Sequence, residues 1–210
     1  TVIDMGGGTT TLSIFVDGQM VHLDALAVGG HHVTMDIARA LSTRLQDAER
    51  IKTLQGSALP SSADDRDFIT VPPVDAETDL PNQIPRSMLT RVIRPRIEEI
   101  LELVRDRLAA SGFAGRVGKR VVLTGGASQL TGLSEVARRI LGRNVRLGRP
   151  LGIAGLPEAA KGPAFAASVG LLIYPQVAQI EQFEPRTLGR RWGLGSGYLA
   201  RVGQWIRESF

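Results

Sequence analysis

The chain has 210 residues, enough for one large domain or two smaller ones with a sizeable hydrophobic core. It contains no cysteine, which excludes a disulfide framework and a thiolate metal site. Its formal charge of +4, from 25 basic and 21 acidic residues, is too small an excess to indicate a nucleic-acid partner. No apolar run is long enough to cross a bilayer, and no signal peptide is evident.

A strand is predicted from Val2 to Met5, and its hairpin partner from Thr10 to Val16. The turn between them contains three glycines, residues 6–8, whose amides can cradle an anion such as a phosphate because no Cβ atom obstructs the approach. Asp4 lies where a carboxylate can hold a hydrated divalent metal or orient a water molecule. The turn matches neither a Walker loop nor G-x-G-x-x-G. An empty hairpin and a phosphate-binding turn therefore both remain open.

The next predicted elements are a second hairpin and a helix. Asp17-Gly18 is a two-residue turn signal that leads into a strand from Met20 to Val28. A single helix is then expected, with Thr34 as its N-cap and its end near Gly56.

Glu49 and Lys52 lie near the end of that helix, three residues apart, and therefore share a face. A carboxylate there can accept hydrogen bonds from ribose hydroxyls, while the lysine stem can lie along a base. The plainer interpretation is a surface ion pair, and the spacing alone favours it.

We interpret the middle of the chain, roughly residues 36–115, as an insertion. A short strand is predicted at Phe68–Val71, followed by an irregular, exposed segment over residues 72–85. The longest helical pattern runs from Ser87 to Ala110. Pro95 lies inside it and should kink the helix or begin its second half.

Strands and helices then alternate again, which predicts an α/β class. A strand at Arg120–Thr124 runs into Gly125-Gly126, and a helix at Leu133–Leu141 precedes a short strand at Asn144–Leu147. The segment Ala164–Tyr174 is apolar on every side, so we expect a buried helix there.

Residues 185–197 are rich in glycine and arginine and are interpreted as a linker. Residues 198–210 form a last helical pattern with an apolar face opposite its arginines, which suits the interface of an anionic membrane. Docking on its own domain is the commoner fate of such a helix, but the flexible linker argues against docking. The predicted membrane-binding residues are Tyr198, Leu199, Arg201, Val202, Trp205, Ile206, Arg207 and Phe210.

Three motifs, in this order, resemble those of the actin/Hsp70/sugar-kinase nucleotide-binding superfamily. Residues 4–10, D-M-G-G-G-T-T, look like its second phosphate motif, and residues 123–129, L-T-G-G-A-S-Q, like its adenosine motif. Residues 167–171 look like its second connecting helix. The resemblance implies an actin-like (ribonuclease H-like) nucleotide-binding lobe with an inserted α/β subdomain and a C-terminal amphipathic helix.

Within that superfamily, the chain is similar to the FtsA family of bacterial cell-division proteins. The similarity lies in residues 28–39, 48–52 and 92–100 and in the closing helix after its linker. It implies a second-lobe core at 1–35 and 116–163, an inserted subdomain at 36–115, and a returning helix of the first lobe at 164–184.

The resemblance implies that the site takes ATP with Mg²⁺. The glycine turn would contact the β- and γ-phosphates, Asp4 would hold Mg²⁺ through water, and Glu49 with Lys52 would flank the ribose and adenine. Thr11 departs from the family, where an aspartate often follows the paired threonines. The expected nucleotide-binding residues are Asp4, Gly6, Gly7, Gly8, Thr9, Thr10, Gly29, Gly30, Glu49, Lys52, Gly125, Gly126 and Gln129.

The sequence starts with Thr1 rather than an initiator Met, directly before the strand predicted at Val2, so we expect the chain to be part of a longer protein that also contains the first phosphate motif. For that reason we expect no measurable affinity for ATP in residues 1–210 alone. No catalytic residue is expected in this chain, and at most a weak ATPase in the whole protein.

The function implied by the resemblance is an ATP-binding scaffold that polymerises on the cytoplasmic face of the inner membrane and tethers the division ring. Arg91, Arg94 and Arg96, which otherwise suit a solvated helix face, would receive the acidic C-terminal tail of the tubulin-like protein FtsZ. Further copies of the protein, anionic lipids and other division proteins are the remaining expected partners, and nucleic acid is not. The alternative is an ATPase or sugar-kinase-like phosphotransferase lobe with a purely structural C-terminal helix.

Overall fold

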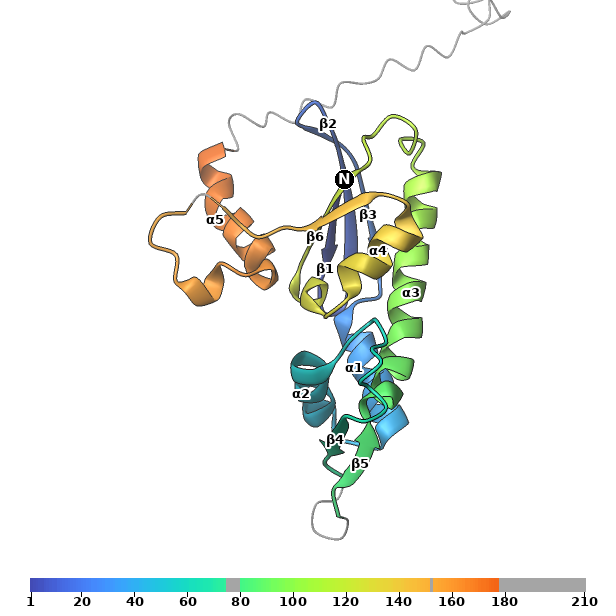
Figure 1. The fold of residues 1–210 in the computed structure, drawn as a ribbon. Helices are drawn as coiled ribbons and strands as arrows, with labels where there is room; N and C mark the ends of the chain where they lie inside the picture. The colour runs from blue at the N-terminus through green and yellow to red at the C-terminus, as the bar shows by residue number, and fades with distance from the viewer. Residues whose placement is uncertain (75–79, 152, 178–210) are drawn as a thin grey trace, which may run out of the picture. The chain divides into compact units, whose positions relative to one another are not determined.

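A five-stranded mixed sheet with strand order β3-β2-β1-β6-β7 forms the centre of the fold in the computed structural model, which describes residues 1–74, 80–151 and 153–177 (Figure 1). β1 pairs antiparallel with β2 and parallel with β6, and β7 pairs parallel with β6. These strands are β1 (Val2–Met5), β2 (Thr10–Val16), β3 (Gln19–Leu26), β6 (Arg120–Thr124) and β7 (Asn144–Leu147). Residues 1–173 form one compact unit, and a second unit begins at Tyr174.

The hairpin predicted at Asp17-Gly18 is confirmed. Both residues adopt positive φ angles, 50° and 80°, which a type I′ turn requires at its two central positions. β2 and β3 therefore pair antiparallel on either side of this turn, with one register shift at Ile14/Phe15.

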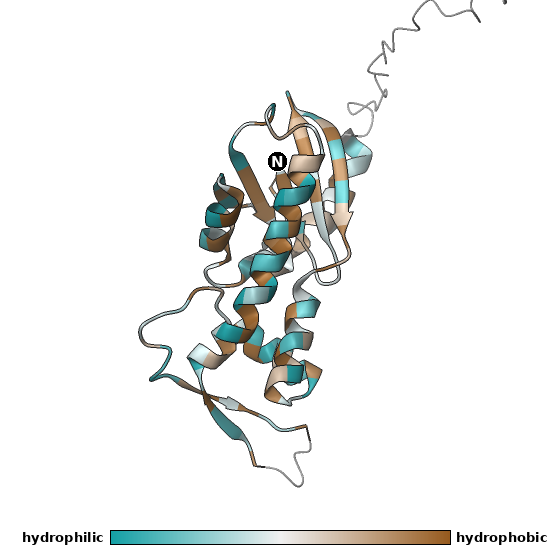
Figure 2. Ribbon diagram, turned by 90° about the vertical axis from the view of Figure 1, so that its right-hand side faces the viewer, coloured by the Kyte–Doolittle hydropathy of each residue, from teal (hydrophilic) through white to brown (hydrophobic). Residues whose placement is uncertain are grey.

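Helix α3 (Arg86–Ala110) contacts both the inserted segment and the central sheet. It packs against α1 (Gly30–Leu41) and β5 (Asn82–Pro85), and also against β2, β3 and α4 (Leu133–Leu141). Brown and teal residues alternate along it in Figure 2, as expected for a helix with one buried face. The inserted segment and the sheet consequently share one hydrophobic core, to which Ile37, Ile93 and Leu123 all belong.

The single helix expected from Thr34 to Gly56 is wrong. The structure has two helices, α1 and α2 (Leu45–Gln55), because Ser42 adopts a left-handed conformation with φ of 49° and ends α1. Thr34 is not the N-cap: Gly29 takes that position, and Thr34 is buried inside α1. The apolar periodicity continues through the break, but Leu45 at the junction is 43% exposed.

The prediction of an irregular segment over residues 72–85 is wrong at its end. Asn82–Pro85 forms β5, which pairs antiparallel with β4 (Phe68–Val71) in a separate two-stranded sheet. Proline is tolerated at the ends of an edge strand because its missing amide need not enter the ladder. The Gln83 Nε2 amide also donates to Thr70 Oγ1 across the pair.

The helix expected at Ala164–Tyr174 is present, but its predicted burial is wrong for this chain. A short 3₁₀ turn at Pro163–Phe165 leads into α5 (Ala166–Val177). Val169 is buried, whereas Leu171 and Leu172 are 73% and 64% exposed. An apolar helix covered on one side only leaves such residues in solvent. The linker and the closing helix, residues 185–210, lie outside the described residues.

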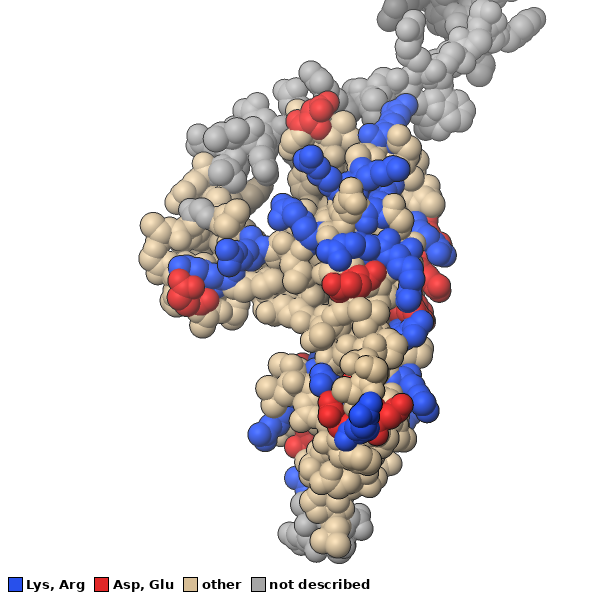
Figure 3. All heavy atoms as spheres, viewed as in Figure 1, with Lys and Arg blue, Asp and Glu red and all other residues tan. Residues whose placement is uncertain are grey.

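Basic side chains are concentrated over α4, β7 and the loop before β6 (Figure 3). The basic residues of this region are Arg116, Lys119, Arg120, Arg138, Arg139, Arg143, Arg146 and Arg149, against a single carboxylate, Glu135. Among the described helices, none is both long enough and apolar enough to span a membrane.

Candidate functional site

The glycine turn after β1 is fixed by the first turn of α1. The Gly30 amide donates to the Gly6 carbonyl at 2.9 Å and the His31 amide to the Gly7 carbonyl at 2.8 Å, so two amides that a helix start usually leaves unpaired are satisfied. The Gly6 amide donates to the Thr9 carbonyl at 2.9 Å. Within the described part of the chain, the amides of residues 7–9 have no acceptor, which leaves them available to an anion.

Gly29 and Gly30 allow this close approach. A Cβ atom at Gly29 would lie 2.6 Å from the carbonyl oxygens of both Gly6 and Gly7. A Cβ atom at Gly30 would lie 2.9 Å from the Cβ of Ala127, in the short 3₁₀ helix that follows β6 (Gly126–Gln129). Any side chain here would push apart the glycine turn, α1 and the segment after β6.

Asp4 lies at the end of β1, in register with Thr124 on the parallel strand β6. Its carboxylate packs so tightly against Gly125 that a Cβ at that position would overlap Asp4 Oδ1, and Gly125 has a φ of 86°. Burial raises the pKa of Asp4 above the usual aspartate range. Among the described residues, no hydrogen-bond donor or basic side chain pairs with this carboxylate.

Glu49 and Lys52 on α2 form the predicted ion pair, but they also reach α1. Lys52 Nζ lies 2.7 Å from Glu49 Oε2, 2.8 Å from Thr34 Oγ1 and 3.1 Å from the Gly30 carbonyl. Burial opposes ionisation of Glu49, but the hydrogen bonds from Lys52 and Thr34 outweigh it and lower the pKa of Glu49. The pair is therefore part of the glycine corner rather than an isolated surface contact.

The structure brings most of the predicted site together at one edge of the sheet. Gly30 connects three groups: it bonds to the glycine turn, accepts from Lys52 and packs against Ala127. Gln129 lies at the end of the 3₁₀ helix, where its Nε2 is 3.5 Å from the Gly126 carbonyl. The Thr10 hydroxyl is buried and donates to the Val28 carbonyl at 2.8 Å, so it already serves the fold.

Sequence reasoning missed Thr34 and His32 as parts of this site. Thr34 bridges Glu49 and Lys52, and His32 Nδ1 accepts a hydrogen bond from the Gly29 amide at 3.2 Å. Thr34 carried one signal: it is a polar residue within the apolar stripe of α1, next to Val33 and one turn before Ile37.

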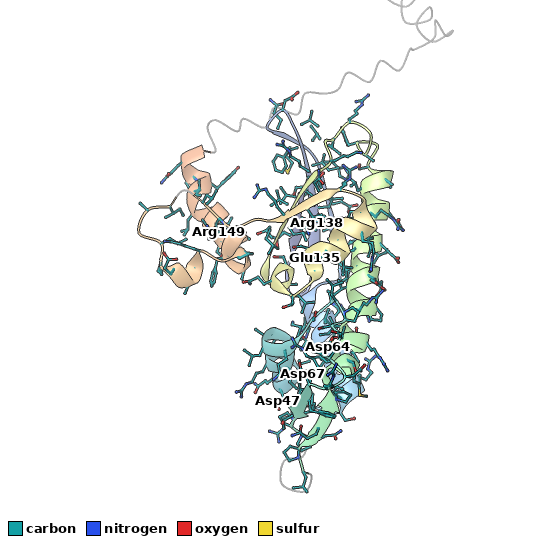
Figure 4. The ribbon with its side chains drawn as sticks, in the orientation of Figure 1. Asp47, Asp64, Asp67, Glu135, Arg138 and Arg149 are labelled. Atoms are coloured by element: carbon teal, nitrogen blue, oxygen red, sulfur yellow. The ribbon has the colours of Figure 1, made fainter. Side chains whose placement is uncertain are left out.

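The three predicted partner-binding arginines have different environments. Arg94 pairs with Glu98 at 2.9 Å, and Arg96 pairs with Asp36 on α1 at 2.6 Å. Arg91 is exposed and has no ion pair within the described ranges. Arg91 and Arg94 line a hollow of about 180 Å³ together with Pro60, Ser61, Asp64, Asp65, Ser87 and Thr90. Asp64 is labelled in Figure 4.

A larger hollow of about 440 Å³ begins at Gln129 and lies between the start of α4 and β7. Glu135 and Arg138, both labelled in Figure 4, line it from α4, and Arg146 lines it from β7. In the described part of the chain, no three His, Asp or Glu side chains gather as a metal site.

Solved structures of other proteins share this architecture. MreB5 of Spiroplasma citri bound to ADP superposes with a TM-score of 0.63 at 20% identity, over 86% of this chain and 55% of that chain. The PilM–PilN type IV pilus biogenesis complex gives a TM-score of 0.59 at 22% identity, over 82% of this chain and 44% of that chain. The predicted fold is confirmed as an actin-like α/β fold.

The family model for cell division protein FtsA matches residues 1–170. The FtsA protein of Agrobacterium fabrum is 61% identical over 99% of this chain and 47% of its own length. FtsA of Escherichia coli K12 is 34% identical over 100% of this chain and 51% of its own length. The chain belongs to the FtsA family, as the sequence resemblance predicted, and it spans about half the length of the curated relatives it matches.

Proposed function

We propose that this chain is the nucleotide-binding second lobe of an ATP-dependent cell-division scaffold that polymerises on the cytoplasmic membrane at the division site. The observation that carries the proposal is the hydrogen-bonded corner in which the glycine turn, the start of α1 and Lys52 meet at Gly30. In the domain organisation that we propose, residues 1–35 and 116–163 form the lobe core, residues 36–115 form its insertion, and residues 164–184 return to a first lobe.

The corner supports nucleotide binding because it offers complementary groups to each part of ATP. The amides of residues 7–9 suit the phosphates, Glu49 suits the ribose hydroxyls, and Gly125 and Gly126 allow backbone to lie close to the base. Solved structures of MreB5 with ADP and with AMPPNP share this fold. Gln129 is proposed to border the adenosine.

The Asp4 carboxylate is suited to Mg²⁺. It is half-buried, lacks a partner among the described residues and has a raised pKa, and a nearby cation would favour its ionised form. Mg²⁺ commonly keeps several waters and takes one or two carboxylates plus phosphate oxygens, so a single aspartate is enough. When bound, the ion would neutralise phosphate charge, and Asp4 would position its water shell.

Two further contacts belong to the same proposal. Residues 198–210 attach the protein to anionic lipid, and the exposed Arg91 with Arg94 receives the acidic tail of FtsZ in the hollow beside α3. Arg96 contributes by fixing α3 to α1 rather than by direct contact, because its guanidinium pairs with two carboxylates, Asp36 and Glu99, whereas that of Arg94 pairs with Glu98 alone.

Electron microscopy of the full-length protein with ATP on a lipid monolayer tests the proposal. Membrane-bound filaments are expected. Rapid ATP turnover without assembly would contradict the scaffold and favour the phosphotransferase alternative.

A further inference from the structure

Thr34 is the centre of a hydrogen-bond network that joins helix α1 to helix α2. Its side chain is fully buried, and Oγ1 lies 2.5 Å from Glu49 Oε2, 2.8 Å from Lys52 Nζ and 3.1 Å from the Gly30 carbonyl. A hydroxyl in a helix interior can bond to the carbonyl four residues earlier, but here it also reaches two charged side chains on another helix.

Each side-chain donor of this network has an acceptor. A lysine ammonium has three N–H donors, and Lys52 has three acceptors within 3.1 Å: the Gly30 carbonyl, Thr34 Oγ1 and Glu49 Oε2. Lys52 therefore satisfies the Gly30 carbonyl, and the single hydroxyl proton of Thr34 is free to point at Glu49 Oε2.

This arrangement gives the two oxygens of Glu49 different roles. Oε2 is held by both Thr34 and Lys52, whereas Oε1 has no partner among the described residues. The Glu49 side chain is 50% exposed and that of Lys52 only 13%. One carboxylate oxygen is thus fixed inside the protein and the other is presented to solvent as an acceptor.

The network also fixes Glu49 relative to the glycine turn. Lys52 bonds to both Thr34 Oγ1 and the Gly30 carbonyl, and the Gly30 amide bonds to the Gly6 carbonyl. A short chain of hydrogen bonds therefore connects the Glu49 carboxylate to the turn that would hold the phosphates. Such a connection would set the distance between the carboxylate that contacts the ribose and the turn that contacts the phosphates.

We propose that Thr34 is a positioning residue that aims Glu49 Oε1 at the ribose 2′-hydroxyl, and so makes the site selective for ribonucleotides over 2′-deoxyribonucleotides. This inference rests on the proposed nucleotide-binding function. Thr34 does not touch the nucleotide; it acts through Glu49, whose lowered pKa keeps the carboxylate an acceptor.

The test compares affinities of the full-length protein for Mg-ATP and Mg-2′-deoxy-ATP by calorimetry. The wild type should prefer ATP by about tenfold, the factor expected for one hydrogen bond of about 1.4 kcal/mol. Thr34→Val keeps the shape and removes the hydroxyl, and it should bring the two affinities to within about twofold by weakening ATP alone. Thr34→Ser keeps the hydroxyl and should retain the preference.

Three outcomes would overturn the inference. The first is a folded Thr34→Val protein that keeps the wild-type preference for ATP over 2′-deoxy-ATP. The second is a Thr34→Val protein that loses affinity for both nucleotides equally, because a merely structural role would have that effect. The third is equal affinity of the wild type for the two nucleotides. If Thr34→Val does not fold, Thr34→Ala provides a second variant. A wild type that binds neither nucleotide would instead overturn the proposed nucleotide-binding function, and this result differs from the three outcomes above.

Discussion

The Arg96 guanidinium on α3 holds the Asp36 carboxylate on α1 through two hydrogen bonds, from Nε to Oδ2 at 2.6 Å and from Nη2 to Oδ1 at 3.1 Å. The two residues are 60 positions apart, and their side chains are 29% and 23% exposed. The hydrogen bond with Asp36 raises the pKa of Arg96 above its usual value. Two-pronged pairs of this kind are stronger than single surface ion pairs.

We expect Arg96→Ala to lower the free energy of unfolding by about 1.5–3 kcal/mol, because hydrogen bonds to charged groups contribute in that range when little exposed. Urea unfolding of the full-length protein measures this. Arg91→Ala is the matched control on the same helix, since Arg91 is exposed, and it should change stability by less than about 0.5 kcal/mol. Equal losses in the two variants would contradict the structural role assigned to Arg96.

Charge reversal at Arg91 should weaken binding of an acidic FtsZ tail peptide without unfolding the protein. Arg91 lines the hollow beside α3 and has no ion pair in the described ranges, so its charge is available to a partner. Fluorescence anisotropy with a labelled peptide should show at least about a tenfold loss for Arg91→Glu, as expected for one charged hydrogen bond. Unchanged affinity would show that the hollow is not the docking surface, and Arg50→Glu on α2 controls for net charge.

Gly29→Ala should destabilise the fold far more than Gly7→Ala. The new Cβ at Gly29 would lie 2.6 Å from two backbone carbonyl oxygens, whereas at Gly7 no atom lies within 4 Å. We expect Gly29→Ala to cost at least about 2 kcal/mol of stability and Gly7→Ala less than about 0.5 kcal/mol. Thermal melts compare them. If Gly7→Ala weakens ATP binding while leaving the melting temperature unchanged, the turn contacts phosphate directly; unimpaired binding would count against that contact.

The elements that could be predicted from sequence are those whose signals are local. The Asp17-Gly18 hairpin, α4 and β7 follow from turn chemistry and apolar spacing within a few residues. The break at Ser42 could not be predicted, because apolar residues continue at helical spacing on both sides of it. β5 was hidden because its pairing partner lies across a segment rich in prolines.

The candidate site, like the fold, could be predicted only where its sequence signals are local. Its glycines and the Glu49–Lys52 pair stand out in the sequence, but their connection depends on tertiary contacts. The need for glycine at position 29 arises only because the Gly6 and Gly7 carbonyls pack against it, and Thr34 joins the site only because α2 folds back onto α1. A buried polar residue in an apolar stripe indicates such a contact without naming the partner.

Asp4→Asn should stabilise the protein at neutral pH and weaken nucleotide binding. Because burial raises the pKa of Asp4, the folded state holds the proton more tightly than the unfolded chain does. The stability that the wild type has at low pH is therefore lost as the pH rises from the ordinary aspartate pKa through the raised one. The melting temperature of Asp4→Asn should exceed that of the wild type at pH 7–8 without nucleotide, and the difference should vanish towards pH 3.

The same variant should raise the Kd for Mg-ATP by about tenfold or more, because it removes the carboxylate that positions the metal's water shell. Calorimetry with and without Mg²⁺ separates the two effects. If Asp4→Asn is destabilised at pH 8, or binds Mg-ATP as the wild type does, then Asp4 does not have the environment and role assigned to it.

Removal of residues 198–210 should abolish attachment of the full-length protein to anionic vesicles. The segment contains two arginines, Arg201 and Arg207, each expected to contribute about 1 kcal/mol near anionic lipid, and apolar residues that include Trp205 and Ile206. A single copy should bind reversibly, and a filament that carries many copies should bind firmly through effective concentration. Co-sedimentation with anionic vesicles measures this, with neutral vesicles as the control. Equal pelleting of the full-length and shortened proteins would exclude this segment as the membrane tether. The double variant Arg201→Glu/Arg207→Glu should weaken binding most at low salt, because surface charges are then least screened.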